Sequence, residues 1–394
     1  MMDAHFGKRL RQVRVARGLT LDALAAAMGG IVTKQAIGKY EKGKALPSAL
    51  VLNRLAVTLG IKSAALWREP AVQIEFVAYR KRSKLALRER EAIESAVGIH
   101  LEERVALEDL LGASNDYTVP VQALAANTLE VAEQAAEELR REWDLGLDPI
   151  ASVVDELEDH HCHVIELDTP DEFDGISAIA RGKDGAVVAG AVVSRRGLPG
   201  DRQRLNVCHE LGRLILKVPE EADAEKLAFR FGAAFLAPAA TLRREIGAKR
   251  AWLDLGELLL LKRTFGISLQ ALLYRLRDLA IISEAHYQRW CVRISQQGWR
   301  KVEPAPLLPE QPRWLERNVR RAVAEGLLTA VDGRRLLGDQ ISEDAPLSLV
   351  ERRAFLGLPL EDRRRLLAEQ AAQYAAEATA ADWEDLETGD FLDE

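Results

Sequence analysis

The stretch from Asn206 to Leu216 constrains the fold and chemistry of this chain more than any other. In helices with the pattern His-Glu-x-x-His, the two histidines lie four residues apart on one face and bind zinc, and the glutamate acts as general base on the metal-bound water. His209 and Glu210 occupy the first two positions of this pattern, but Arg213 stands where the second histidine is required. Arginine is permanently protonated and cannot donate a lone pair to a metal. The helix therefore belongs either to an enzyme or to a remodelled relative of one.

Length and composition limit the classes of protein to which the chain can belong. Its 394 residues predict two or three domains with ample apolar content for buried cores. No run of about 18 apolar residues predicts a membrane span, and the charged first ten residues are unlike a secretory signal. Three scattered cysteines predict no disulfide framework. We therefore expect a cytoplasmic protein with no membrane partner.

The net charge of −7 hides a strong asymmetry between the two ends of the chain. Residues 1–70 hold 12 Lys and Arg against 4 Asp and Glu, a balance of +8. Residues 343–394 hold 5 against 14, a balance of −9. A basic head suits nucleic acid, and the acidic tail suggests a different partner.

Residues 1–70 predict a five-helix head with a helix-turn-helix. Thr20 and Thr33 are N-cap candidates for two short helices that Gly29-Gly30 separates. The runs Arg14-x-x-Arg17-Gly18-Leu19-Thr20 and Tyr40-Glu41-Lys42-Gly43-x-x-x-Pro47 resemble the XRE (Cro/C1-type) family. That family reads double-stranded DNA operators, so the resemblance implies a transcription regulator.

In a helix-turn-helix the second helix lies in the major groove, with its N-terminal part facing the bases. Lys34, Gln35 and Lys39 are long enough to reach base edges or phosphates, and Thr33 could hold a phosphate. We predict these four residues as the DNA-binding set. The alternative is a solvated charged face on a small helical bundle.

Residues 71–145 are expected to form a connector. Residues 72–79 alternate as a strand, and residues 85–111 and 121–145 carry helical periodicity. The helices could be solvated, or they could carry the contacts of a homodimer, which a two-fold operator requires.

Residues 146–305 predict strands at 163–167, 173–179 and 186–193. The helix at 206–216, into which residues 199–202 lead, and helices at 224–236, 255–265 and 268–279 follow. The runs Asp201-Arg202-Gln203-Arg204…His209-Glu210-Leu211-Gly212 and Glu225-x-x-Ala228-x-x-Phe231 resemble the ImmA/IrrE metallopeptidase family, as does Phe173-Asp174-Gly175 upstream. The resemblance implies a zincin-like fold and cleavage of a repressor. By position, His209 and Glu225 would be zinc ligands and Glu210 the general base.

Arg213 departs from the family pattern and leaves three interpretations. A catalytic zinc normally has three protein ligands and an open position, so two ligands beside a fixed cation would bind weakly. In the interpretation that we favour, the Arg213 guanidinium takes the place of the metal and pairs with Glu210 and Glu225, so that no cofactor is needed. The others are zinc held by a substitute ligand, and a genuine zinc endopeptidase.

Other groups in this region have simpler interpretations. The contiguous run from His160 to His163 would point its side chains to opposite faces of a strand, so incidental ligands are favoured over a metal site. Cys208 is expected to be a small core residue rather than a nucleophile paired with His209. The helix pair at 255–279 has a second helix-turn-helix shape, in which Gln270 and Arg275 could touch DNA, although its apolar density favours a packed hairpin.

Residues 306–342 predict a proline-rich linker and small helices, and residues 343–394 an acidic tail. The run Phe355-Leu356-x-Leu358-Pro359-Leu360-Glu361 resembles C-terminal segments of bacterial antitoxins that mask a toxin. Apolar side chains at Phe355, Leu358, Leu360, Trp383 and Phe391 are the predicted partner-binding residues. The alternative is a disordered solubilising tail.

The sequence therefore predicts an α+β protein, mainly helical with a small sheet, that extends into a helical C-terminal segment. The leading hypothesis is a DNA-binding regulator, the antitoxin of a toxin–antitoxin pair, with a degenerate protease-like domain. The rivals are a zinc endopeptidase that cleaves a repressor, and a stress- or phage-linked regulator whose protease-like domain senses a ligand.

Overall fold

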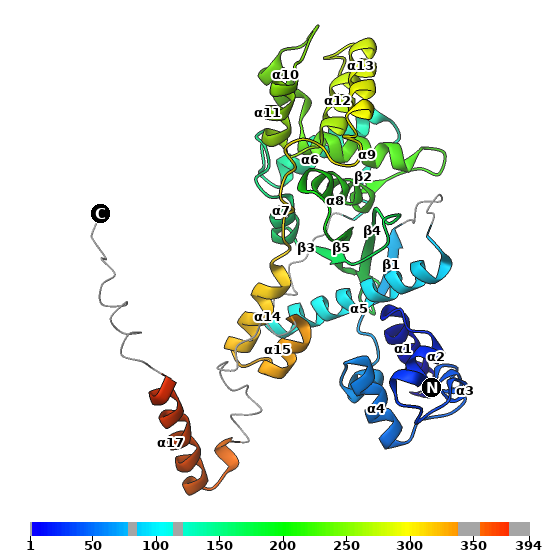
Figure 1. Ribbon diagram of the computed structural model, residues 1–394, viewed down its shortest axis with the longest axis vertical. Coiled ribbons are helices and arrows are strands. Elements are labelled where there is room, and N and C mark those ends of the chain that lie inside the picture. Colours follow the sequence, from blue (N-terminus) through cyan, green and yellow to red (C-terminus); the bar gives the residue numbers. More distant parts are fainter. Residues whose placement is uncertain (1, 78–84, 113–120, 338–354, 378–394) are drawn as a thin grey trace. The chain divides into compact units, whose positions relative to one another are not determined.

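The computed structural model describes residues 2–77, 85–112, 121–337 and 355–377. As the sequence predicts, the structure is α+β, mainly helical with a small sheet (Figure 1). The chain divides into two compact units, Met1–Arg317 and Asn318–Glu394. Within the described ranges, no helix has the length and apolar character that a membrane crossing requires.

The N-terminal head contains five helical elements, of which the last is a 3-10 helix. They are α1 (Met2–Ala16), α2 (Leu21–Ala27), α3 (Lys34–Glu41), α4 (Ala49–Leu59) and η1 (Ser63–Leu66). Thr20 caps α2 by accepting the Ala23 N–H, and Thr33 caps α3 by accepting the Ala36 N–H. The apolar faces of these helices meet in a core of their own around Phe6, Leu24 and Ile37.

Four strands form the main sheet of the first unit. In the order β1 (Gln73–Val77), β4 (Gly175–Arg181), β5 (Val187–Arg195) and β3 (Cys162–Leu167), the first three pair antiparallel and the last runs parallel to β5. Two short strands, β2 (Leu124–Ala125) and β6 (Leu216–Lys217), pair in parallel beside it.

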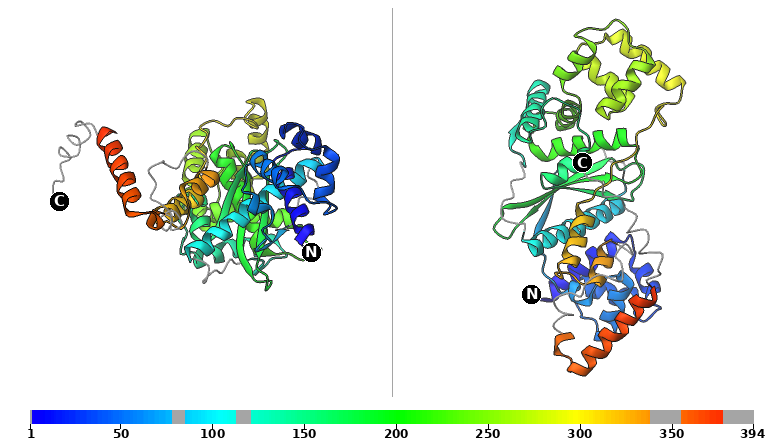
Figure 2. Two further views of the ribbon diagram at one scale, coloured as in Figure 1. Left: turned by 90° about the horizontal axis from the view of Figure 1, so that it is seen from below. Right: turned by 90° about the vertical axis from the view of Figure 1, so that its left-hand side faces the viewer.

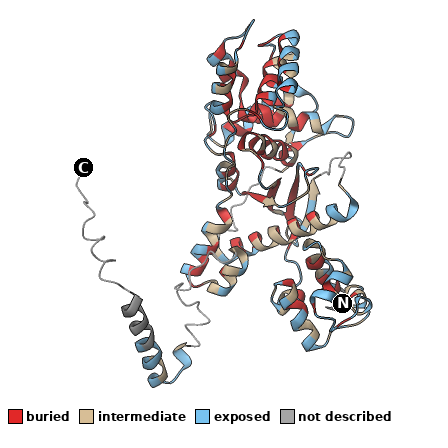
Figure 3. Ribbon diagram, in the orientation of Figure 1, coloured by how far each residue is buried: buried red, intermediate tan, exposed pale blue. Residues whose placement is uncertain are grey.

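Different helices cover the two faces of this sheet. The long helix α5 (Leu87–Leu111) packs an apolar stripe against one face, and α8 (Gly200–Ile215) lies on the other (Figures 1 and 2). Strand residues alternate accordingly, because Ile176 and Ala178 join the core under α5, whereas Ile179 faces the core under α8. Buried residues lie throughout the sheet and along α8, and many more lie in the helices beyond α8 (Figure 3).

A helical layer continues beyond α8. It contains α6 (Leu129–Glu142), α7 (Val153–Asp159), α9 (Ala224–Leu236), α10 (Ala239–Ile246), α11 (Leu255–Phe265), α12 (Leu269–Asp278) and α13 (Glu284–Gln296). The helices α10 and α13 were not expected from the sequence. Pro238, two residues after the end of α9, is the N-cap of α10, and Ser283 caps α13.

Residues 71–145, expected as a connector, contribute to this same sheet and helical layer. Strand β1 pairs with β4, α5 covers the sheet, and α6 packs against α9. The start of the helix expected from residue 121 is wrong, because β2 and the N-cap Thr128 precede α6. These contacts join elements far apart in the chain, which a local pattern does not record.

Residues 304–312, expected as part of a linker, lie against α8, and we call them the strap. Gly200 donates its N–H to Leu307 O at 2.8 Å. Gln203 exchanges two 2.7 Å hydrogen bonds with the backbone of Glu310, whose carboxylate also contacts Arg204. After the strap come α14 (Trp314–Ala324) and α15 (Ala330–Leu337), and α17 (Leu360–Glu377) lies in the second unit.

Candidate functional site

Helices α8 and α9 cross closely because each places a glycine at the contact. A Cβ on Gly212 would lie 2.8 Å from Phe231 Cδ1, and a Cβ on Gly232 would lie 2.9 Å from His209 N. Both distances are too short for any side chain, so the crossing requires glycine. The close crossing brings Glu225, in the first turn of α9, against the face of α8 that carries His209 and Arg213.

Four side chains of these two helices form one cluster. The Glu225 carboxylate is shared, since Oε1 lies 2.9 Å from Arg213 Nη1 and Oε2 lies 3.1 Å from His209 Nε2. Glu210 Oε1 is more distant, 3.8 Å from Arg213 Nη1 and 4.0 Å from His209 Nε2. The side chains of Glu210 and Arg213 are 4% and 8% exposed, whereas that of Glu225 is 39% exposed.

Strand β4 holds Glu210 from the sheet side. Ser177 Oγ lies 2.7 Å from the Glu210 carbonyl oxygen and 2.8 Å from its Oε2, so its hydroxyl can donate to either. A Cβ on Gly175 would lie 2.9 Å from Glu210 Cγ. Sequence reasoning missed Ser177, although the spacing of two small residues on one strand face was a signal for close packing there.

A small cavity of about 20 Å³ opens between His209 and Glu210, lined also by Asp174, Leu205, Asn206 and Phe229. A cavity of this size accommodates about one water molecule. A water in this cavity would lie beside the Glu210 carboxylate, which already accepts a hydrogen bond from the Ser177 hydroxyl.

The side chains of this cluster do not fit a zinc ion. A tetrahedral catalytic zinc needs three protein ligands and one open position. His209 and Glu225 supply two donors, and the Arg213 guanidinium already engages one carboxylate oxygen of Glu225. Within the described ranges, no group of three or more His, Cys, Asp or Glu residues could hold a metal.

In the head, α3 presents the residues predicted to bind DNA. Gln35 and Lys39 are exposed on it, and Lys34 forms a 3.0 Å ion pair with Asp22 of α2. Thr33 is occupied as the N-cap of the helix. Arg14 joins α1 to the end of α3, because its Nε lies 2.5 Å from Glu41 Oε1 and both side chains are buried.

Comparison with known protein families matches both parts of the chain. Residues 10–66 match the family described as Helix-turn-helix, and residues 159–277 match the family described as IrrE N-terminal-like domain. The chain combines an XRE-type helix-turn-helix with an IrrE-like domain.

One similar protein is the SPbeta prophage-derived uncharacterized HTH-type transcriptional regulator YonR of Bacillus subtilis. It is 34% identical over 70 residues, which are 18% of this chain and 63% of the relative. The match thus covers less than two thirds of the relative's own length. No solved structure matches the chain.

Helix α9 of the IrrE-like domain carries a second charged cluster, which sequence reasoning also missed. Glu133 of α6 accepts from Arg230 Nε at 2.5 Å and from Arg275 at 2.7 and 2.5 Å. Arg230 also lies 3.3 Å from Asp278. Arg275 is 1% exposed and hydrogen-bonded in this way, so it does not face solvent. The helices α11 and α12 pack against each other as a hairpin.

Cys162, Cys208 and His163 of the IrrE-like domain are buried, whereas His160 is half-buried and His161 is exposed. Burial raises the pKa of the Cys208 thiol and raises that of Cys162 to about 12, so neither is a ready nucleophile. His163 is fully buried, 3.4 Å from Glu108, and its ring packs edge-on against Trp314. His160 instead stacks on Trp143, so these two histidines do not converge on one site.

All five predicted partner-binding residues belong to the second unit, and three of them are among the described residues. Leu360 is the first residue of α17 and is exposed, as are Leu356 and Leu358 just before that helix. Phe355 is half-buried. Trp383 and Phe391 lie outside the described residues.

Proposed function

We propose that the protein is a sequence-specific regulator that binds a double-stranded DNA operator through α3. The observation that carries this proposal is the exposure of Gln35 and Lys39 on a helix that Thr33 and the Arg14–Glu41 pair position. The similarity of the head to a named HTH-type transcriptional regulator supports it. Two copies would bind a two-fold operator, so we also propose a homodimer on DNA.

A gel-shift titration with the DNA upstream of the gene tests this proposal. Gln35→Ala should weaken binding by about 1–3 kcal/mol if the amide reads a base, and Lys39→Ala should lower the salt slope by about 1 if the lysine meets a phosphate. Lys34→Ala should have a smaller effect because Lys34 already pairs with Asp22. Lys183→Ala, at an exposed residue of the turn between β4 and β5, is the control. Unchanged affinity and salt slope in all three α3 variants would contradict the assignment.

We further propose that the IrrE-like domain is a pseudoprotease, in which Arg213 takes the place of a metal. The shared Glu225 carboxylate and the small cavity beside Glu210 support this proposal. Metal analysis of the purified full-length protein should find far less than one zinc per chain. Stoichiometric zinc, together with a proteolytic activity that Glu210→Gln abolishes, would make the domain a zinc endopeptidase instead.

We also propose that the protein is an antitoxin whose second unit binds a toxin. The exposed leucines at 356, 358 and 360 support this proposal, because an exposed apolar stretch of this kind commonly docks into a groove of a partner. The test is co-expression of the full-length protein with the product of the neighbouring gene. Leu360→Glu should reduce co-purification and restore toxicity, whereas Leu260→Glu, at an exposed leucine of α11, should not. If both variants behave as the wild type does, the antitoxin proposal fails.

A further inference from the structure

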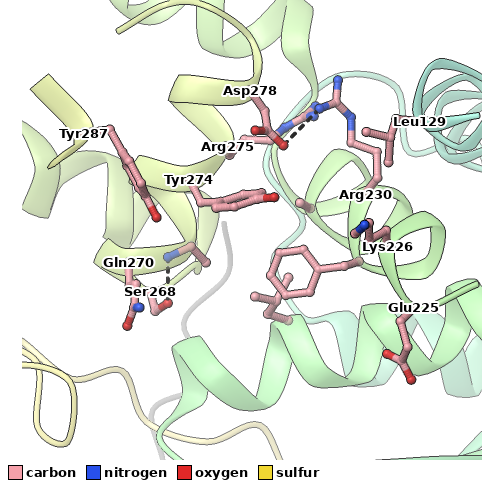
Figure 4. Close-up of a pocket in the computed structure, with 14 residues that line it drawn as sticks. Leu129, Glu225, Lys226, Arg230, Ser268, Gln270, Tyr274, Arg275, Asp278 and Tyr287 are labelled. Carbon is pink, nitrogen blue, oxygen red and sulfur yellow. Dashed lines mark hydrogen bonds and ion pairs between the residues drawn. The ribbon is translucent and has the colours of Figure 1, made fainter. Parts of the chain in front are cut away.

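A cavity of about 500 Å³ lies in the helical layer of the IrrE-like domain. Helix α9 forms one wall and α12 and α13 form the other (Figure 4). The volume falls within the range of about 300–1,000 Å³ that is typical of small-molecule sites. The cavity is therefore large enough for a ligand of several fused or linked rings.

The charged side chains around the cavity compensate one another. Arg230 and Arg275 share Glu133, and Asp278 pairs with both Arg230 and Arg277, so each of these charged groups has a partner of opposite charge. At the rim, Lys226 pairs with Asp223 at 3.2 Å. A charged ligand would have to compete with these pairs or enter unpaired, which is costly in a partly buried site. The charge balance therefore favours a neutral ligand.

Aromatic rings supply much of the apolar wall. Phe229 meets Tyr274 edge-on with ring centroids 5.9 Å apart, and Tyr274 meets Tyr287 in the same way at 6.3 Å. The Arg277 guanidinium lies 4.2 Å from the Tyr274 ring and 4.7 Å from the Tyr287 ring, which holds both tyrosines in place. Such rings favour a flat aromatic ligand, with which they can stack or make edge contacts.

Polar groups gather on the tyrosine side of the cavity. Ser268 and Gln270 lie there together with Tyr274 and Tyr287, opposite Lys226 and Leu129 (Figure 4). Hydroxyl and amide groups can both donate and accept hydrogen bonds. They could therefore orient a neutral ligand that carries one or two polar atoms at one end.

The cavity is distinct from the small cavity at His209 and Glu210. Phe229 and Leu205 line both, so they separate the two spaces, and the Phe229 ring lies 6.1 Å from the His209 ring. Glu225 is at the edge of the larger cavity, where its carboxylate is also shared by Arg213 and His209. Of the four residues in the cluster, only Glu225 lines the larger cavity, so a ligand there would reach the cluster through that carboxylate.

We propose that this cavity binds a neutral, planar aromatic small molecule, whose rings pack between Phe229, Tyr274 and Tyr287. The site is independent of the proposals for DNA and toxin binding, because none of its residues belongs to the head or to the second unit.

Fluorescence titration of the full-length protein with N-phenyl-1-naphthylamine, a neutral aromatic dye, tests the site. Binding should saturate at one dye per chain. Tyr274→Ala should weaken it about tenfold, because an aromatic wall is lost. Leu129→Trp should weaken it by narrowing the rim, whereas Leu260→Trp, at an exposed leucine outside the cavity, should leave it unchanged. Circular dichroism and thermal melts verify that each variant is folded.

The anionic analogue 8-anilinonaphthalene-1-sulfonate tests the charge argument, because it adds a sulfonate to the same rings. It should bind about tenfold more weakly than the neutral dye. Dye binding that does not saturate, or that survives in both folded cavity variants, overturns the site. Equal or tighter binding of the anionic dye overturns the assignment of a neutral ligand.

Discussion

Helix α9 carries two charged clusters that are built in opposite ways. Around Arg230, each guanidinium and carboxylate has a partner, and Arg275 is bonded to both Glu133 and the Ala237 carbonyl. Around Glu225, one carboxylate serves both an arginine and a histidine, and neither ring nitrogen of His209 has a hydrogen bond in the described structure. Full pairing holds three helices together, whereas at the other cluster a single carboxylate is divided between two partners.

The largest expected effect comes from breaking the fully paired cluster. Glu133→Ala would leave Arg275 buried without its carboxylate, and such a loss typically costs about 3–5 kcal/mol. Chemical denaturation of the full-length protein would measure the change. Glu137→Ala, at an exposed residue of the same helix, should change stability little. A cost for Glu133→Ala no larger than that of the control would show that the cluster does not hold the helices together.

The next effect comes from restoring a metal ligand to the other cluster. Arg213→His should allow zinc to bind His209, residue 213 and Glu225, and elemental analysis should find about one zinc per chain. Zinc at about 100 times its dissociation constant would stabilise the variant by about 3 kcal/mol, which thermal melts would detect. Arg213→Ala, which removes the cation but adds no ligand, should not gain stoichiometric zinc. Failure of Arg213→His to bind zinc would show that the surrounding helices have lost the geometry of a metal site.

A smaller effect should follow from releasing Glu210 on its sheet side. Ser177→Ala removes the hydroxyl that lies 2.8 Å from the buried carboxylate, and a lost hydrogen bond to a charged group costs about 1.5–3 kcal/mol. The measurement is again equilibrium denaturation. Ser295→Ala, at a residue of α13, is the matched control. If Ser177→Ala is as stable as the control, Glu210 is held by Arg213 rather than by the strand.

The smallest effect that we predict is a response to mild acid. Burial lowers the pKa of His163, so the folded state favours the neutral imidazole. The stability that this neutral ring contributes is present above the unfolded pKa of about 6.5 and is lost as the pH falls below that value. Burial alone would raise the pKa of Glu133, but Arg275 and Arg230 lower it, so that cluster should persist from pH 7 to pH 5. His163→Gln should flatten the stability profile between pH 7 and pH 5, whereas His5→Gln should not. An equally steep profile in His163→Gln would assign the acid response to another group.

The features that local chemistry determines could be predicted from the sequence. Side-chain caps at Thr20 and Thr33 and the glycine turn locate the helices of the head. The bounds of α9 follow from its apolar spacing and from the proline that ends it. The contact between Arg213 and Glu225 was also expected, because only one helix crossing is needed to bring them together. What this contact does in the protein remains a proposal.

The features that escaped prediction depend on partners far along the chain. Ser177 reaches Glu210 across 33 residues, and Glu133 reaches Arg275 across 142. Spacing within a segment cannot show such pairs, because only the finished packing brings them together. The hydrogen bonds made by the expected connector and linker are long-range in the same way, since β1 needs β4, and the strap needs α8, to form them.

The absence of a side chain at Gly200 allows the strap to lie directly against the start of α8. A Cβ there would lie 2.1 Å from the carbonyl oxygen of Leu308, so any other residue would lift the strap from α8. The chain directly after the strap is held by Glu158, which accepts the N–H groups of Arg313 and Trp314. One added methyl group at residue 200 would therefore loosen the strap, and limited proteolysis should cut a Gly200→Ala variant there faster than the wild type.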